Sequence, residues 1–200
     1  MVTARKRKIG SSTDDTRLSV RTLAQAKAFV LRARICGIFS DAKGTMPCLW
    51  VVVDLPERRV GEAGWGEKVT AIWRWKNELP AKYPREIFYG KIKGGLAVLM
   101  SVDYLRREHY PRHYRRLEDC SALARRLYEV IRLDPISTGS LREEVGMTDR
   151  ADRNRFDKAL QELQITLNVV RRNSLRDEKD TWVPFSEQHL DVLRAAKPRS

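Results

Sequence analysis

The sequence predicts an α+β fold that is mostly helical and divided into two tandem lobes. Apolar residues recur with the period of amphipathic helices in four segments, at 22–39, 67–79, 121–133 and 150–166. In each half of the chain, two short apolar runs that flank a turn-forming tip follow the helices, which is typical of a β-hairpin. Hydrophobic residues make up 42% of the 200-residue chain, so each lobe can bury a core.

The last part of the chain, residues 120–200, has the clearest order of elements. Thr138 can cap a second helix that stops at Gly146, and Ser186 can cap a final helix. Three helices followed by a hairpin is the order of a winged helix-turn-helix. The expected elements are a helix, an extended step, two more helices and two strands, at 121–133, 135–137, 139–145, 150–166, 167–173 and 181–185.

Residues 19–103 are expected to form a second, winged-helix-like lobe. A helix over 22–39 precedes the run CLWVVVDL, which fits either a short helix or a strand. A helix over 67–79 follows, closed by Pro80, and Gly94-Gly95 suits a hairpin turn. The spacing of the tryptophans in this lobe predicts a core role for Trp50, Trp65, Trp73 and Trp75.

Two basic segments flank this first lobe. Residues 1–18 have the composition of a disordered basic arm, and 104–119 of a basic linker. From 106 to 116 the linker carries five arginines and one glutamate, a formal charge of 5 − 1 = +4. We expect Pro111 to break any long helix there, and nothing in the pattern requires burial.

The charge of the whole chain favours a polyanionic partner. Lys plus Arg outnumber Asp plus Glu by 39 to 26, which gives a net charge of +13. The three cysteines are far apart and form no CxxC pair, so the pattern indicates neither a disulfide framework nor a metal site. We expect no cofactor. No run is long and apolar enough for a membrane span, so we expect a cytoplasmic protein.

The polar side of the helix at 150–166 is the predicted DNA-reading surface. Its opposite side is apolar and must face the core, while the third helix of a helix-turn-helix lies in the major groove. The hairpin at 171–183 and the linker offer further cations for phosphates. A winged helix that binds a protein partner is the open alternative. The candidate nucleic-acid-binding residues are Arg150, Arg153, Asn154, Arg155, Lys158, Gln161, Arg171, Arg172, Arg176, Lys179, Arg112, Arg115 and Arg116.

Several stretches resemble small bacterial proteins related to the AlkZ-type winged-helix DNA glycosylases. They are ARICGIFSDAKGTMPCLWVVV, AIWRWKNELP, FYGKIKGGLAVLMS and PISTGSLREEVGM with RFDKALQELQITLNVVRR, within residues 29–185. The resemblance implies tandem winged helices and a DNA partner, since those glycosylases excise alkylated bases. Their Gln-x-Gln or Gln-x-Asp motif is absent, because no glutamine here has Gln or Asp two places on. The resemblance therefore carries over no catalytic residue.

The sequence favours a non-catalytic double-stranded DNA-binding protein over an enzyme. Two carboxylates are candidates for activating water, Glu78 in the tryptophan- and lysine-rich block and Asp54 after the apolar run. A surface carboxylate or a helix cap is the ordinary reading of each. If the protein is an enzyme, a DNA glycosylase using one of them beside Lys76 and Lys91 is the version to test.

Overall fold

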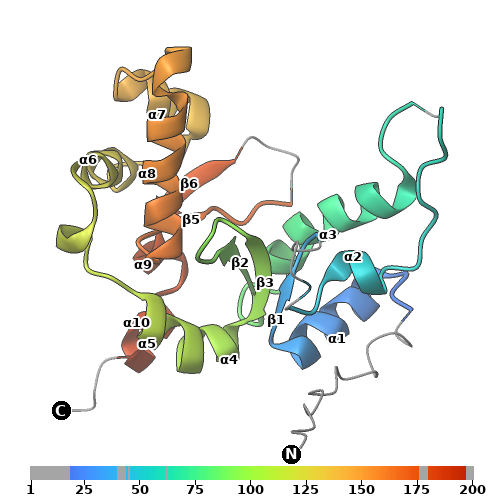
Figure 1. The fold of residues 1–200 in the computed structure, drawn as a ribbon. Helices are drawn as coiled ribbons and strands as arrows, with labels where there is room; N and C mark the ends of the chain where they lie inside the picture. Colours follow the sequence, from blue (N-terminus) through green and yellow to red (C-terminus); the bar gives the residue numbers. More distant parts are fainter. Residues whose placement is uncertain (1–18, 40–43, 45, 62, 176–179, 197–200) are drawn as a thin grey trace, which may run out of the picture.

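The computed structural model describes residues 19–39, 44, 46–61, 63–175 and 180–196, and the predicted arm at 1–18 lies outside them. The fold is α+β, with helices packed around two small antiparallel sheets (Figure 1). None of the helices in these residues is long and apolar enough to cross a membrane.

In its described residues, the first half forms three helices and one three-stranded sheet. Its elements are α1 (Leu23–Ala33), β1 (Ile35–Gly37), α2 (Leu49–Val52), α3 (Glu67–Lys82), β2 (Ile87–Lys91) and β3 (Ala97–Ser101), and the strand order is β1-β3-β2. The predicted hairpin is confirmed, because β2 pairs with β3 around Gly94 and Gly95, which both have positive φ angles. The open choice for the valine-rich run is settled as the short helix α2.

Two expected boundaries in this half were wrong. The first helix ends at Ala33 rather than near Phe39, because Arg34 takes a φ of 65° and the chain then turns back as β1, which pairs with β3. Pro80 does not close α3, which continues to Lys82. A proline near the end of a helix removes one donor, and here the last turn tolerates it.

The two halves are joined by a helical segment that is partly buried and is exposed over residues 111–116. It comprises α4 (Val102–Tyr104), the π-helical turn η2 (Leu105–His109), α5 (Tyr110–His113) and the 3₁₀ turn η3 (Leu117–Asp119). Leu105, His109 and Tyr110 are buried. The expectation that nothing here requires burial was therefore wrong. Pro111 also does not break the helix, because the helical turns continue from Val102 through Pro111 to His113.

The second half repeats the order of the first. Its elements are α6 (Ala122–Ile131), β4 (Ile136–Ser137), α7 (Thr138–Glu144), η4 (Arg150–Asp152), α8 (Arg153–Ile165), β5 (Val169–Arg171), β6 (Thr181–Pro184), α9 (Phe185–Gln188) and α10 (Leu190–Ala196). The strand order is β4-β6-β5. Each half thus forms a helix, a strand, two helices and two further strands, in that order. In each sheet the last strand of the half lies between the other two.

The caps of this half differ from those expected. Ser137, not Thr138, accepts the backbone N–H of Ser140 at the start of α7. The expected final helix is divided into α9 and α10, and Ser186 lies inside α9 rather than before it.

The halves share part of their core. One cluster belongs to the first half and one to the second, but a third joins Phe88, Val98 and Met100 to residues of the second half. Phe88 packs against Phe185 with ring centroids 6.2 Å apart. The sheets therefore rest against each other through apolar contacts, as the adjacent β2 and β5 in Figure 1 indicate.

The tryptophans separate into two groups. Trp75 is 1% exposed and Trp50 is half-buried, as expected. Trp65 and Trp73, by contrast, are 61% and 40% exposed, so the prediction that they are core residues was wrong. Trp73 follows the buried Ile72 by one residue and so projects from the outer side of α3.

Candidate nucleic-acid interface

The predicted polar side of α8 is exposed over its N-terminal half. Phe156, Ala159, Leu160 and Leu163 are buried as expected, which fixes the opposite side outward. The predicted DNA-binding residues exposed on or just before this half are Arg150, Arg153, Asn154, Arg155 and Lys158, and the carboxylates of Asp149 and Asp157 are exposed beside them.

The C-terminal half of α8 lies against the β2–β3 turn of the first half. A Cβ atom placed on Gly95, whose φ is +79°, would lie 2.7 Å from Oε1 of Gln161. Gln161 is therefore half-buried under the turn and not freely exposed. This contact between the lobes was not expected from the sequence.

Beside Gln161 a hollow of about 350 Å³, which we call the basic groove, brings together cations from three separate segments. Lys93 comes from the β2–β3 turn, Arg112 from α5 and Lys158 from α8. Glu162 is held by Ser121, whose N–H and Oγ donate to its two carboxylate oxygens at 3.0 and 2.5 Å. The lining is Lys93, Arg112, His113, Arg115, Lys158, Gln161, Glu162, Ile165 and Thr166.

Several of these cations also meet carboxylates at the surface. Arg112 pairs with Glu108 at 2.5 Å, and Arg116, outside the groove, pairs with Glu118 at 3.3 Å. On α8 the corresponding pairs are Arg153 with Asp157 at 3.8 Å and Arg155 with Asp152 at 3.4 Å. Exposed pairs of this kind are weak, so a phosphate can compete for the same guanidinium groups.

Arg171 has a different environment from the one predicted for a wing residue. Its side chain is only 10% exposed, and Nη1 donates to Oδ1 of Asn77 at 2.7 Å and to Oδ1 of Asp180 at 3.2 Å. Its guanidinium lies 4.6 Å from the ring centre of Tyr89, so it connects the lobes. Arg172 is exposed, whereas Arg176 and Lys179 lie outside the described residues.

A second hollow, of about 510 Å³, lies along the outer side of α3. We call it the tryptophan hollow. Sequence reasoning missed it, although the spacing 70, 73, 74, 77 and 78 marks one helical face. The candidate Glu78 belongs to it and forms ion pairs with Lys82 at 3.0 Å and Arg74 at 3.9 Å. The lining is Trp65, Thr70, Trp73, Arg74, Asn77, Glu78 and Leu175.

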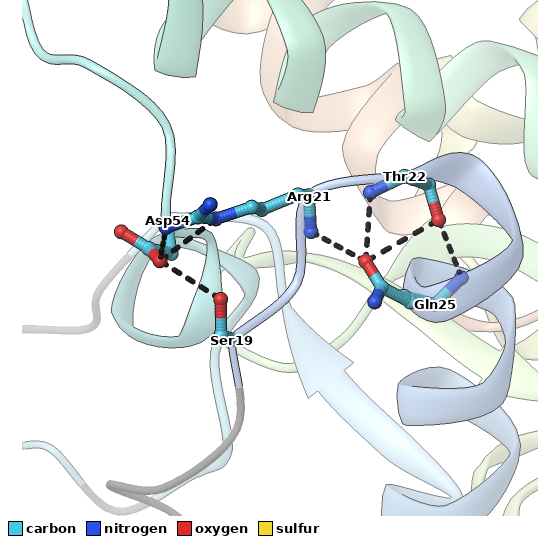
Figure 2. A network of polar contacts seen from close by, with 5 residues as sticks. All are labelled: Ser19, Arg21, Thr22, Gln25 and Asp54. Carbon is cyan, nitrogen blue, oxygen red and sulfur yellow. Dashed lines mark hydrogen bonds and ion pairs between the residues drawn. The ribbon is translucent and has the colours of Figure 1, made fainter.

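The other candidate carboxylate, Asp54, has a local structural role (Figure 2). Its Oδ2 accepts from Nη2 of Arg21 at 2.6 Å and from Oγ of Ser19 at 2.8 Å, next to the Thr22–Gln25 capping box of α1. The hydrogen bonds from Arg21 and Ser19 hold the pKa of the Asp54 carboxyl below its ordinary value. Such a carboxylate is a poor proton acceptor near neutral pH.

A model of the family described as AlkZ related matches residues 20–183. The chain belongs to the AlkZ-related family. The resemblance seen in the sequence is thereby confirmed. No curated protein and no solved structure matched the chain.

The matched range of this AlkZ-related protein contains the first sheet, the second sheet except Pro184, the joining helical segment and the basic groove. The described residues contain no group of three or more metal-ligating side chains. Cys36, Cys48 and Cys120 are buried and form no disulfide with one another, and burial raises the pKa of the Cys36 thiol to about 12. A thiol in that state is a poor metal ligand and nucleophile.

Proposed function

We propose that this AlkZ-related protein binds double-stranded DNA without catalysing a reaction on it. The observation that carries the proposal is the basic groove, where Lys93, Arg112, Arg115 and Lys158 converge from three segments. The exposed N-terminal half of α8 adjoins it. That half enters the major groove and the groove cations bind the flanking phosphates.

We also propose that both lobes are winged helices. The repeated order of elements and the matching strand orders β1-β3-β2 and β4-β6-β5 support this. Residues 19–103 and 120–200 are then the two lobes, and 104–119 is a packed connection whose arginines serve the DNA surface. In this arrangement Arg171 stabilises the contact between the two lobes, and the exposed Arg172 binds a DNA phosphate. A cytoplasmic location, where bacterial DNA lies, is part of the proposal.

Reversing two groove charges tests the DNA surface. The combined variant Lys158→Glu with Arg112→Glu should weaken binding to a 20-base-pair duplex at low salt by roughly tenfold or more. The matched control is Arg85→Glu with Arg132→Glu, which changes the net charge equally at exposed residues outside the groove and outside the tryptophan hollow. Equal losses in the two variants would mean that total charge, and not this surface, governs binding.

A DNA glycosylase is the second candidate, because the family resemblance includes such enzymes and Glu78 lines the tryptophan hollow. Incubating the protein with alkylated duplex and assaying for abasic sites tests it. Base release that is lost in Glu78→Gln would establish catalysis and overturn the non-catalytic proposal. Release no faster than without protein removes the candidate for those lesions.

A further inference from the structure

Trp65 and Trp73 expose aromatic surface in a hollow of the size that holds small ligands. Exposed tryptophans gathered in one concave site commonly mark a binding surface. We propose that the tryptophan hollow binds an unpaired nucleobase of a DNA strand. This inference rests on the proposed DNA binding and adds a second site to it.

The aromatic walls are held in place before any ligand arrives. Trp73 meets Trp65 edge to face, with ring centroids 5.3 Å apart and an interplanar angle of 69°. Nζ of the buried Lys76 lies 3.5 Å from the ring centre of Trp73. Oγ1 of Thr70 donates to the backbone carbonyl of Trp65 at 3.3 Å. Trp65 is therefore the more open ring, positioned as a stacking platform whose ordering costs little on binding.

The rest of the lining suits the polar edge of a base. Asn77 and Glu78 stand on the same side of α3 as Trp73, four and five residues along. Oδ1 of Asn77 accepts from Arg171, which orients the amide and presents its NH₂ group as a donor. Amide and carboxylate side chains pair with base edges, and Arg74 supplies a cation for the attached phosphate.

The repeat of the fold gives independent support. The buried positions of α3, at 68, 71, 72, 75 and 76, recur in α8 at 156, 159, 160, 163 and 164. Trp73 therefore takes in the first lobe the position that Gln161 takes in the second. Gln161 lines the basic groove, so the tryptophan hollow lies on the corresponding helix face of the first lobe.

The two surfaces are connected through a third hollow, of about 390 Å³. It shares Gln161 with the basic groove and contains Arg171, which is hydrogen-bonded to Asn77 of the tryptophan hollow. Its charges balance, because Lys91 and Arg171 lie there together with Asp157 and Asp180. The cation available to a phosphate is Arg74 in the tryptophan hollow itself. Two tryptophan rings beside the oriented Asn77 amide suit the face and the polar edge of a base together, so we favour the nucleobase over a peptide.

Comparing two duplexes tests the inference. One is fully paired, and the other has the same length with one unpaired, bulged nucleotide. The protein should bind the bulged duplex at least about fivefold more tightly, since stacking on an aromatic side chain contributes that much per base. Trp65→Ala should abolish the preference and leave binding of the paired duplex unchanged. Trp65→Phe should retain part of the preference, and Leu133→Ala, which removes exposed apolar surface in the other lobe, should retain all of it.

A second measurement needs no variant. With 2-aminopurine as the unpaired base, stacking on Trp65 should lower its fluorescence on binding. Binding of the paired duplex without any preference for the bulge, or a preference that Trp65→Ala keeps, overturns the inference and leaves the proposed function standing. Binding of neither duplex overturns the proposed function itself.

Discussion

Arg171 shows how a residue that looks like a phosphate ligand in the sequence becomes a structural contact. Its guanidinium joins Asn77 of α3 to Asp180 at the start of β6 and stacks on Tyr89 of β2. In the sequence, the arginine-rich end of β5 predicts a basic wing that contains Arg171. The Arg171 side chain is largely buried because it contacts Asn77 and Tyr89 of the other half, whereas Arg172 is exposed. The sequence around these two arginines does not show which of them makes that contact.

Truncating Arg171 should therefore lower stability. Arg171→Ala removes two hydrogen bonds and the contact with Tyr89, and we expect the free energy of unfolding to fall by about 1–3 kcal/mol. Urea denaturation measures it. The neighbouring Arg172→Ala, which changes an exposed side chain, should cost less than about 0.5 kcal/mol. Equal losses would contradict the role given to Arg171.

His189 makes stability depend on pH. Burial between Phe88 and Phe185 lowers its pKa from 6.5 to about 4, since the charged ring is poorly solvated there. The unfolded chain takes up a proton at His189 near pH 6.5, whereas the folded protein does so only near pH 4. The folded state is therefore fully stable with respect to this group above pH 6.5 and loses stability as the pH falls toward 4. Between pH 7 and pH 5 we expect a loss on the order of 2 kcal/mol from this group. Chemical denaturation at both pH values should show a smaller loss in His189→Phe, and an unchanged loss would rule out His189 as its source.

Elements with strong local signals were predicted, and elements that depend on packing were not. The period of the apolar residues predicted α6 and α8, and the Gly94-Gly95 pair predicted the turn between β2 and β3. β1 has only three residues and exists because β3 offers a free edge. The helical joining segment follows from burial of Leu105 and Tyr110 against the second half, which its basic composition conceals.

The start of α6 links the stability of an element to the DNA surface. Ser121 accepts the N–H of Ala124 and also holds Glu162 of α8, whereas Ser137 caps α7 without a carboxylate partner. We expect Ser121→Ala to cost about 2 kcal/mol and Ser137→Ala about 1 kcal/mol, measured by thermal unfolding. The Ser121→Ala variant also releases the Glu162 carboxylate, which lines the basic groove. We therefore expect this variant to bind DNA more weakly as well. Loss of DNA affinity in Ser137→Ala alone would contradict this arrangement.

At the scale of the whole molecule, the two halves repeat the same order of elements and share part of their core. The cluster around Phe88 and Phe185 buries apolar side chains from both halves, so neither half completes its core alone. The repeated element order was predicted from the sequence in outline. The contact between the lobes was not, because it depends on side chains far apart in the chain, such as Gly95 and Gln161.

This shared core predicts a single unfolding transition. Urea denaturation followed by tryptophan fluorescence and by circular dichroism should give coincident curves with one midpoint. Four of the five tryptophans lie in the first half, so fluorescence reports mainly on that lobe. Two separate midpoints would indicate lobes that fold independently.

The central claim is that cations of the basic groove and α8 bind the phosphates of double-stranded DNA. Titrating affinity for a fully paired duplex against salt concentration tests it most directly. If five or so phosphates are bound, log K should fall with log salt with a slope of about −4 to −5. Lys158→Glu with Arg112→Glu should make this slope shallower by about 2. A wild-type slope near zero, or one that the variant leaves unchanged, would contradict the account and favour a surface for a protein partner.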